Sequence, residues 1–366
     1  MRPRSSRTLA AAVALACALG APGAELLSIE VGTVWTGAGE TFSPGCVLVR
    51  DGKILHVGAP ATVGADAERL AFPDGFLMPS LTDAHTHLAV QDRADLNEVA
   101  VPIYPEFRIA DCLTASVIKS GALYEEGVLA AYVSPGPRQL VAGRGAVIDL
   151  AAEAVVPGLM TMSLTGAALC DDREPMSRAG LGLLLREKAP GAVAGAPALR
   201  IFAAELNEAE QALAFARAQN AKAVLVGCAR LDMLPALEGA AEAIVVPAPT
   251  VAPRDLGRMA EASRKGIRIA FASWADSVWE VNLRFLAALA HRHGMPREEA
   301  LRGLTVHAAE ACGRSAALVA GGPAEFVIYG GDPLDPLEER PEGEEAVPGG
   351  IRELHVEGDR RQVDDR

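Results

Sequence analysis

The spacing of hydrophobic and polar positions divides the chain into regions of different texture. Short β-like segments, separated by turn residues, fill residues 26–72. In the clearest pair, Asp51 and Gly52 stand between apolar runs at 47–49 and 54–57, a pattern typical of a tight β-hairpin. The sequence therefore predicts that strands alone precede the first helix.

From residue 76 onward, apolar strand-like runs alternate with helical stretches rich in Ala, Leu and Glu. Two of these stretches are residues 208–219 and 281–293, and Gly294 and Pro296 end the second one. Such alternation favours a parallel sheet, closed or open. The strand-like runs are FLMPSLTDAHTHL, VLAAYVSP, LRIFAAE, AKAVLVGC, EAIVVPAP and IRIAFAS.

Strands return after residue 313 as AEFVIYGG and IRELHVEG. A β-rich beginning and a β-rich end around an α/β middle predict that the two ends pair into one small domain. The predicted division is a composite β-domain of residues 25–78 and 315–358, an α/β domain of residues 79–314 and a charged tail of residues 359–366.

Composition narrows the class of protein. The chain has 366 residues, of which 50% are hydrophobic and 22% charged, which excludes long disorder, collagen-like repeats and a coiled coil. Its formal charge of −13 would repel a phosphate backbone, which argues against nucleic acid as a partner. A small molecule or a protein is the partner that this composition favours.

The first 24 residues have the pattern of an export signal. Arginines lie near the start, residues 9–19 are an uncharged apolar run, and small residues at 21–24 offer a cleavage site. The run is too short for an ordinary transmembrane helix. We therefore expect an exported protein, periplasmic or secreted, with no membrane contact beyond this segment. An uncleaved anchor and lipidation of Cys17 remain alternatives.

The other cysteines are widely separated and form no C-x-x-C pair, which excludes a disulfide framework and a structural zinc knuckle. We expect most of them to be small buried apolar residues, although oxidation of one pair in an export compartment stays open. They are Cys46, Cys112, Cys170, Cys228 and Cys312.

One motif carries chemical information: Asp83-Ala84-His85-Thr86-His87, at the end of the apolar run FLMPSL. Residues i and i+2 of a strand share a face, so the rings of His85 and His87 can converge on one ion. The alternative is that both are packed polar residues without a ligand.

With its surroundings, this motif resembles the amidohydrolase superfamily, specifically the imidazolonepropionase-like hydrolases and dipeptidases. The resemblance covers most of residues 26–358 and is looser over residues 151–200, where the chain looks shortened. It is carried by VLVRDGKILHVG, FLMPSLTDAHTHL, GMPREEALRGLTVHAAEACG and AEFVIYGGDPLDP.

The resemblance implies a (β/α)8 TIM-like barrel with a small β-sandwich domain built from both chain termini. It also implies one or two divalent metals at the C-terminal mouth of the barrel, where metal-bound water attacks an amide, ester or imide carbonyl. The runner-up fold is an open doubly wound sheet.

The ligands that the family would supply are only partly present. His85 and His87 match, whereas two further family histidines fall on Ala204 and Gly227, and the family's bridging Lys falls on Asp149. At the last strand Trp274 takes the expected position of the family's Asp, and Asp276 follows two residues later. The resemblance therefore implies at most one Zn²⁺, held by His85, His87 and Asp276. Asp276 would also be the catalytic proton acceptor, and the possible helpers are Asp149, Glu205 and Cys228.

The remaining histidines have simpler interpretations. His56 and His355 lie in the terminal β-regions, and His291 and His293 suit a helix C-terminus. His307 stands where a helix begins, so we expect it to act as a cap.

Two functional hypotheses follow. The first is a metal-dependent hydrolase of a C–N bond in a small amide, dipeptide-like or cyclic imide-like substrate. The second is a catalytically silent member of the family that binds a ligand or a partner protein.

Overall fold

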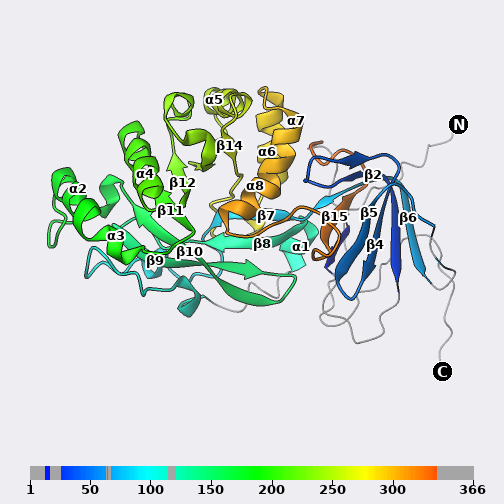
Figure 1. The fold of residues 1–366 in the computed structure, drawn as a ribbon, viewed down its shortest axis with the longest axis horizontal. Coiled ribbons are helices and arrows are strands. Elements are labelled where there is room, and N and C mark those ends of the chain that lie inside the picture. Colours follow the sequence, from blue (N-terminus) through cyan, green and yellow to red (C-terminus); the bar gives the residue numbers. More distant parts are fainter. Residues whose placement is uncertain (1–12, 17–25, 63, 65–66, 114–120, 336–366) are drawn as a thin grey trace, which may run out of the picture.

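The computed structural model describes residues 13–16, 26–62, 64, 67–113 and 121–335. Two separate sheets organise these residues, and Figure 1 shows them side by side along the long axis of the molecule. The first sheet has seven strands in the order β1-β15-β6-β2-β4-β5, with β3 paired to β2. They are β1 (Val13–Ala16), β2 (Leu27–Trp35), β3 (Thr41–Phe42), β4 (Gly45–Arg50), β5 (Lys53–Gly58), β6 (Glu68–Pro79) and β15 (Glu325–Tyr329).

The hairpin predicted at Asp51 and Gly52 is confirmed, because β4 and β5 pair antiparallel across this turn. Both residues are left-handed, with φ of 52° and 69°, as a type I′ turn requires. At the other side of the sheet β15 pairs with β6, so residues from the two ends of the described chain share one sheet. Its core includes the fully buried Ile29, Val47 and Phe326.

Parts of the sequence predictions lie outside the described residues. Within the predicted export signal only β1 is described, and it pairs with β15. The predicted strand IRELHVEG and the charged tail are not described either. Within the described part of the chain, no helix has the length and apolar character needed to cross a bilayer.

The second sheet has eight strands, which follow each other in chain order from β7 to β14. Neighbours pair in parallel from β10 to β14 and between β7 and β8. Their carboxyl ends therefore meet at one edge of the sheet. The strands are β7 (Leu81–Thr86), β8 (Val128–Val133), β9 (Val141–Asp149), β10 (Ala154–Ser163), β11 (Ala198–Phe202), β12 (Lys222–Cys228), β13 (Ile244–Pro247) and β14 (Arg268–Ile269).

Strand β9 departs from the predicted parallel arrangement, because it pairs antiparallel with both β8 and β10. The reason is the length of its connections: only residues 134–140 and 150–153 join the three strands. A parallel crossover requires a dozen or more residues. For this stretch the expectation of strands alternating with helices was therefore wrong.

The eight-stranded sheet is curled, so that the segment after β14 lies beside β7. The backbone N–H of Ala84 donates to the carbonyl of Phe271 at 3.2 Å, and that of Trp274 donates to the carbonyl of His85 at 2.9 Å. Helices lie along one side of the curl in Figure 1. They include α2 (Arg178–Glu187), α4 (Leu206–Ala218), α5 (Pro253–Arg264), α6 (Leu283–Arg292), α7 (Arg297–Leu304) and α8 (Val306–Ala311).

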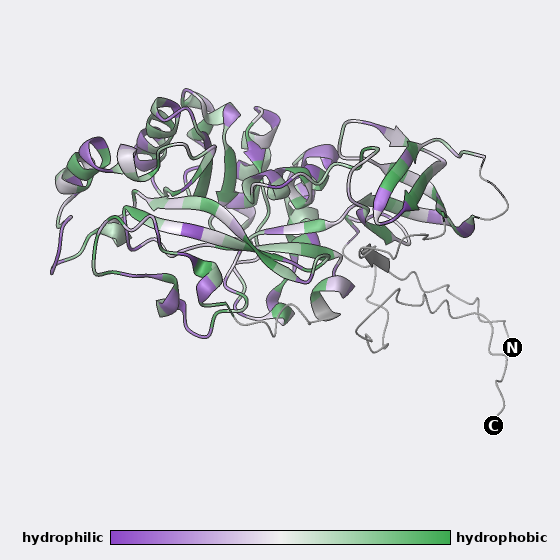
Figure 2. Cartoon of the chain, turned by 60° about the horizontal axis from the view of Figure 1, so that its bottom comes forward, coloured by the Kyte–Doolittle hydropathy of each residue, from purple (hydrophilic) through white to green (hydrophobic). Residues whose placement is uncertain are grey.

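Hydropathy follows this arrangement. Figure 2 shows mostly hydrophobic residues along the strands of the curled sheet, whereas the helices carry both hydrophobic and hydrophilic residues, as amphipathic helices do. Inside the curl, side chains from several strands pack together, among them Ala84, Phe202, Val226 and Val246. The chain enters this sheet directly from the first one, since β6 ends at Pro79 and β7 begins at Leu81.

Candidate functional site

The face of β7 that carries Asp83 and His85 is fixed to the segment that follows β14. One carboxylate oxygen of Asp83 accepts from the backbone N–H of Ser273 at 2.9 Å and from that of His85 at 3.2 Å. The other accepts from the hydroxyl of Ser273. Complete burial raises the pKa of Asp83 to about 6, against the effect of these hydrogen bonds. Asp83 thus holds the strand that presents the histidines.

His85 contacts an arginine that the sequence analysis did not single out. Arg200, on β11, is fully buried, and its Nη2 lies 3.2 Å from Nδ1 of His85. The same guanidinium donates to the carbonyls of Ala84 at 2.6 Å and Ala311 at 3.1 Å, and it lies over the ring of Tyr132. The available signal was a charged residue within the apolar run LRIFAAE, because a buried charge requires partners.

The ring of His85 is enclosed by aromatic side chains. Trp274 lies closest, with ring centroids 4.0 Å apart, followed by His87 at 5.3 Å and Phe202 at 5.8 Å. Only 2% of His85 is exposed, and its Nε2 has no hydrogen-bond partner among the described residues. Burial, with the charge of Arg200, lowers the pKa of His85 well below 6.5, so the ring is neutral at pH 7.

His87 lies at the carboxyl end of β7 and keeps 11% of its side chain exposed. Its Nδ1 lies 3.3 Å from the carbonyl oxygen of Trp274 and 3.7 Å from a carboxylate oxygen of Asp276. Burial and the charge of Arg93 lower the pKa of His87, and Asp276 partly opposes them. A neutral ring that donates Nδ1–H to the carbonyl has its lone pair on Nε2, where it can accept a proton.

Asp276 lies beside His87, as the sequence analysis expected, but both of its oxygens bind an arginine. Arg93 donates to them from Nε at 2.7 Å and from Nη2 at 2.5 Å. This arginine, in the short 3₁₀ helix Arg93–Leu96, lowers the pKa of Asp276. A carboxylate that is stabilised in this way binds a proton weakly, so the structure favours His87 as the proton acceptor.

The expected helpers have other roles. Because β9 runs in the opposite direction, Asp149 lies level with Ala130, near the amino end of β8, and binds Arg314 at 2.5 Å. Glu205 caps α4 in a capping box. Cys228 is buried, which raises its pKa to about 11, and so it is a neutral thiol at pH 7. In the described part of the chain no three His, Cys, Asp or Glu side chains are grouped as metal ligands would be.

His307 does not cap α8, as the sequence analysis expected. The residue at the cap position is Thr305, whereas His307 is buried inside the helix with Nδ1 3.3 Å from the carbonyl oxygen of Ile269. His291 and His293 do end a helix, α6, as predicted. The cysteines from Cys46 to Cys312 named in the sequence analysis are all free.

The donor atoms do not fit a divalent metal as they are arranged. His87 has a suitable form, since a ligating histidine commonly donates its other N–H to a carbonyl. However, Arg200 donates to Nδ1 of His85, which leaves the proton of the neutral ring on Nε2, and Arg93 already pairs with both oxygens of Asp276. A zinc ion on these three residues would also lie near a buried guanidinium. No catalytic step is therefore assigned to a metal here.

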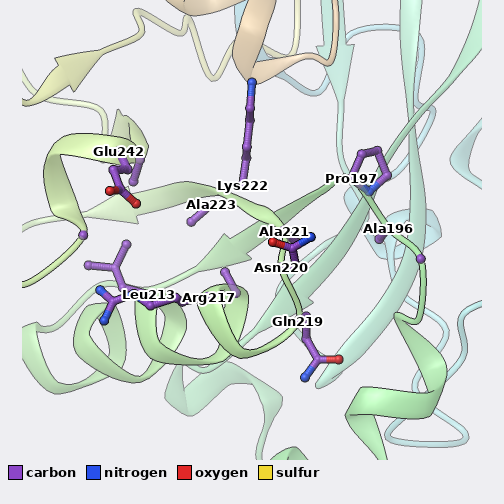
Figure 3. Close-up of a pocket in the computed structure, with 14 residues that line it drawn as sticks. Ala196, Pro197, Leu213, Arg217, Gln219, Asn220, Ala221, Lys222, Ala223 and Glu242 are labelled. Atoms are coloured by element: carbon purple, nitrogen blue, oxygen red, sulfur yellow. The ribbon is translucent and has the colours of Figure 1, made fainter.

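A cavity lies at the other edge of the curled sheet. It has a volume of about 650 Å³, and its lining includes Pro197, Lys222 and Glu242 together with Leu213 and Arg217 of α4 (Figure 3). Pro197 and Lys222 lie at the amino ends of β11 and β12, whereas His87 follows the carboxyl end of β7. This cavity is therefore separate from the histidine site.

Fold and site together define an α/β protein whose curled sheet presents paired histidines at its carboxyl edge, and the comparisons confirm its resemblance to the amidohydrolase superfamily in fold. An amidohydrolase from Thermotoga maritima MSB8 superimposes with a TM-score of 0.68 at 21% identity, covering 84% of this chain and 95% of its own. A prolidase complexed with N-methylphosphonate-L-proline gives a TM-score of 0.51 at 15% identity, covering 85% and 94%.

One curated protein shares local sequence with this chain. The imidazolonepropionase of Serratia proteamaculans (strain 568) is 41% identical over 63 residues, which are 16% of this chain and 15% of that protein. The chain thus matches only a small part of this relative's length. No family model matches the sequence.

Proposed function

We propose that this protein hydrolyses a C–N bond in a small molecule, of the amide, dipeptide or cyclic imide class, at the carboxyl edge of the curled sheet. The fold similarity to an amidohydrolase over 84% of the chain supports this assignment. The observation that carries it is His87, a partly exposed imidazole at this edge with its Nε2 lone pair available. The proposal includes a barrel that departs from the regular (β/α)8 pattern at the antiparallel strand β9, and export of the protein.

The residues present supply a proton-transfer step without a metal. His87 takes a proton at Nε2 from a water molecule whose oxygen attacks the substrate carbonyl, and it returns that proton to the nitrogen that leaves as the C–N bond breaks, while the carbonyl of Trp274 holds its Nδ1–H. The positive ring that results is stabilised by the carboxylate of Asp276, 3.7 Å from Nδ1. Arg93 holds that carboxylate in place and is itself more than half exposed.

A second candidate is a ligand-binding protein without catalysis. One observation favours it: Arg200 is bound to His85, so the histidine nearest to the interior is occupied by the protein itself. The hydrolysis test described next separates the two candidates.

The test is hydrolysis by the chelator-treated full-length protein of a panel of N-acyl amino acids, dipeptides and cyclic imides. Replacement of a general base reduces the rate by a factor of about 10²–10⁴, so we expect this loss of kcat/KM in His87→Ala. His293→Ala, at an exposed helix end, is the matched control and should keep full activity. Hydrolysis that persists in His87→Ala contradicts the mechanism, and no hydrolysis of any compound supports the binding protein.

A further inference from the structure

We propose that Arg200 is a positioning residue that fixes His85 as a hydrogen-bond donor at Nε2 and so withholds this histidine from metal ions. The proposal concerns the site used in the proposed function, but it is tested without measuring hydrolysis. Four steps support it: the placement of the guanidinium, the direction of its hydrogen bond, the consequence for a metal, and the contrast with His87.

The guanidinium of Arg200 is held in place from several elements. Its Nη2 donates to the carbonyl of Ala84 on β7, its Nη1 donates to the carbonyl of Ala311 on α8, and its Cζ lies 4.2 Å from the ring centroid of Tyr132 on β8. The whole side chain is buried. Because these contacts come from three elements, the group stays beside His85 unless the interior of the curl rearranges.

The direction of the hydrogen bond between Arg200 and His85 is fixed by chemistry. An arginine has five N–H donors and no acceptor, so at 3.2 Å from Nη2 the Nδ1 of His85 must be the acceptor. The neutral ring then carries its single proton on Nε2. That Nε2 is buried and has no hydrogen-bond partner among the described residues, while the rings of Trp274, His87 and Phe202 lie around the imidazole.

A metal at Nε2 of His85 would require the opposite tautomer. The proton would move to Nδ1, where it would face an N–H of Arg200 at 3.2 Å, so that two donors opposed each other. The metal would also bring two further positive charges toward a fully buried cation, where the low dielectric strengthens repulsion. The arrangement therefore disfavours a metal twice, through hydrogen bonding and through charge.

His87 provides an internal contrast two residues away. Its Nδ1 lies 3.3 Å from a carbonyl oxygen, which is only an acceptor, so its proton is on Nδ1 and its lone pair on Nε2. The two histidines of the motif are thus expected in opposite tautomers, although a sequence pattern treats them as equivalent.

The test is ¹⁵N spectroscopy of the histidine rings in the full-length protein. Long-range ¹H–¹⁵N correlations distinguish Nδ1–H from Nε2–H, and the sequence has only 7 histidines to assign. The signals of His85 and His87 are identified by their loss in His85→Gln and His87→Gln. We expect the Nε2–H form for His85 and the Nδ1–H form for His87. An Nδ1–H form of His85 overturns the proposal.

A second measurement uses Co²⁺ alone as a metal probe. In the wild-type protein, stoichiometric Co²⁺ should produce no ligand-field absorption that depends on His85. In Arg200→Met the Nε2–H preference should be lost, whereas the control Arg93→Met, which removes a cation beside His87 and Asp276, should keep it. A folded Arg200→Met that retains the wild-type tautomer overturns the proposal, as does Co²⁺ binding by wild-type His85. If Arg200→Met does not fold, the wild-type spectra decide.

Discussion

Arg314 should be a main contributor to stability where the two sheets meet. Its Nη1 binds Asp149 on β9 at 2.5 Å, and its Nη2 binds Glu325 on β15 at 3.0 Å. Of the three side chains, 19%, 12% and 21% are exposed. Replacing Arg314 with Met leaves two poorly hydrated carboxylates without their counter-ion.

The magnitude follows from this burial. Removing one partner of a buried ion pair costs about 3–5 kcal/mol, and because these groups keep some contact with water, we expect about 2–4 kcal/mol for Arg314→Met. The matched control is Lys188→Met, which breaks the pair with Glu174, whose side chains are 58% and 61% exposed. Such surface pairs contribute about 0.2–1 kcal/mol.

The assay is urea unfolding followed by tryptophan fluorescence, with free energies compared at neutral and mildly acidic pH. Burial already raises the pKa of Glu325, and Arg314 opposes this effect. Without Arg314 the pKa rises further, so the folded variant binds a proton more tightly than the unfolded chain does. The deficit of Arg314→Met should therefore shrink as the pH falls through that raised pKa. Equal losses in both variants, or a deficit that does not change with pH, would refute the reasoning.

Two further predictions concern stability. Burial lowers the pKa of His307 from 6.5 to about 4, so only the unfolded chain is protonated between these values. The free energy of unfolding should therefore fall by up to about 3 kcal/mol as the pH is lowered through this window. The urea midpoints of His307→Gln should lose that part of the pH dependence, and an unchanged pH profile in this variant would contradict the prediction. Gly143 has a φ of +86°, and a Cβ there would meet the carbonyl oxygen of Phe107. Gly143→Ala should therefore lower the free energy of unfolding by about 2 kcal/mol or more, whereas Gly191→Ala, with open space around its Cβ, should not lower it; similar midpoints for both variants would count against this account.

Much of the fold could be read from local patterns. The apolar runs gave most strands of the curled sheet, and the turn at Asp51 and Gly52 gave the hairpin. Strands β9 and β10 were missed, because Gly143, Gly145 and Gly158 interrupt their apolar pattern. Two of these glycines face Tyr132, whose ring occupies the space that a Cβ would need. That requirement arises from packing between strands, which a local pattern does not contain.

The candidate site was only partly predictable for a similar reason. Strand alternation correctly put His85 and His87 at the end of β7, and Asp276 was correctly expected near His87. Arg200 was missed because its partners, Ala84 and Ala311, are more than a hundred residues away in sequence. The reversed direction of β9 removed Asp149 from the site, and a motif alignment carries no information on strand direction.

The short passage from β6 to β7 has a mechanical consequence. Ser80 alone separates the last residue of one sheet from the first residue of the other. A pull or twist on the seven-stranded sheet therefore passes along the backbone into the strand that bears His85, with no loop to absorb it. Substitutions in the interior of the seven-stranded sheet should therefore shift the positions of the imidazoles of β7 and the residue that follows it.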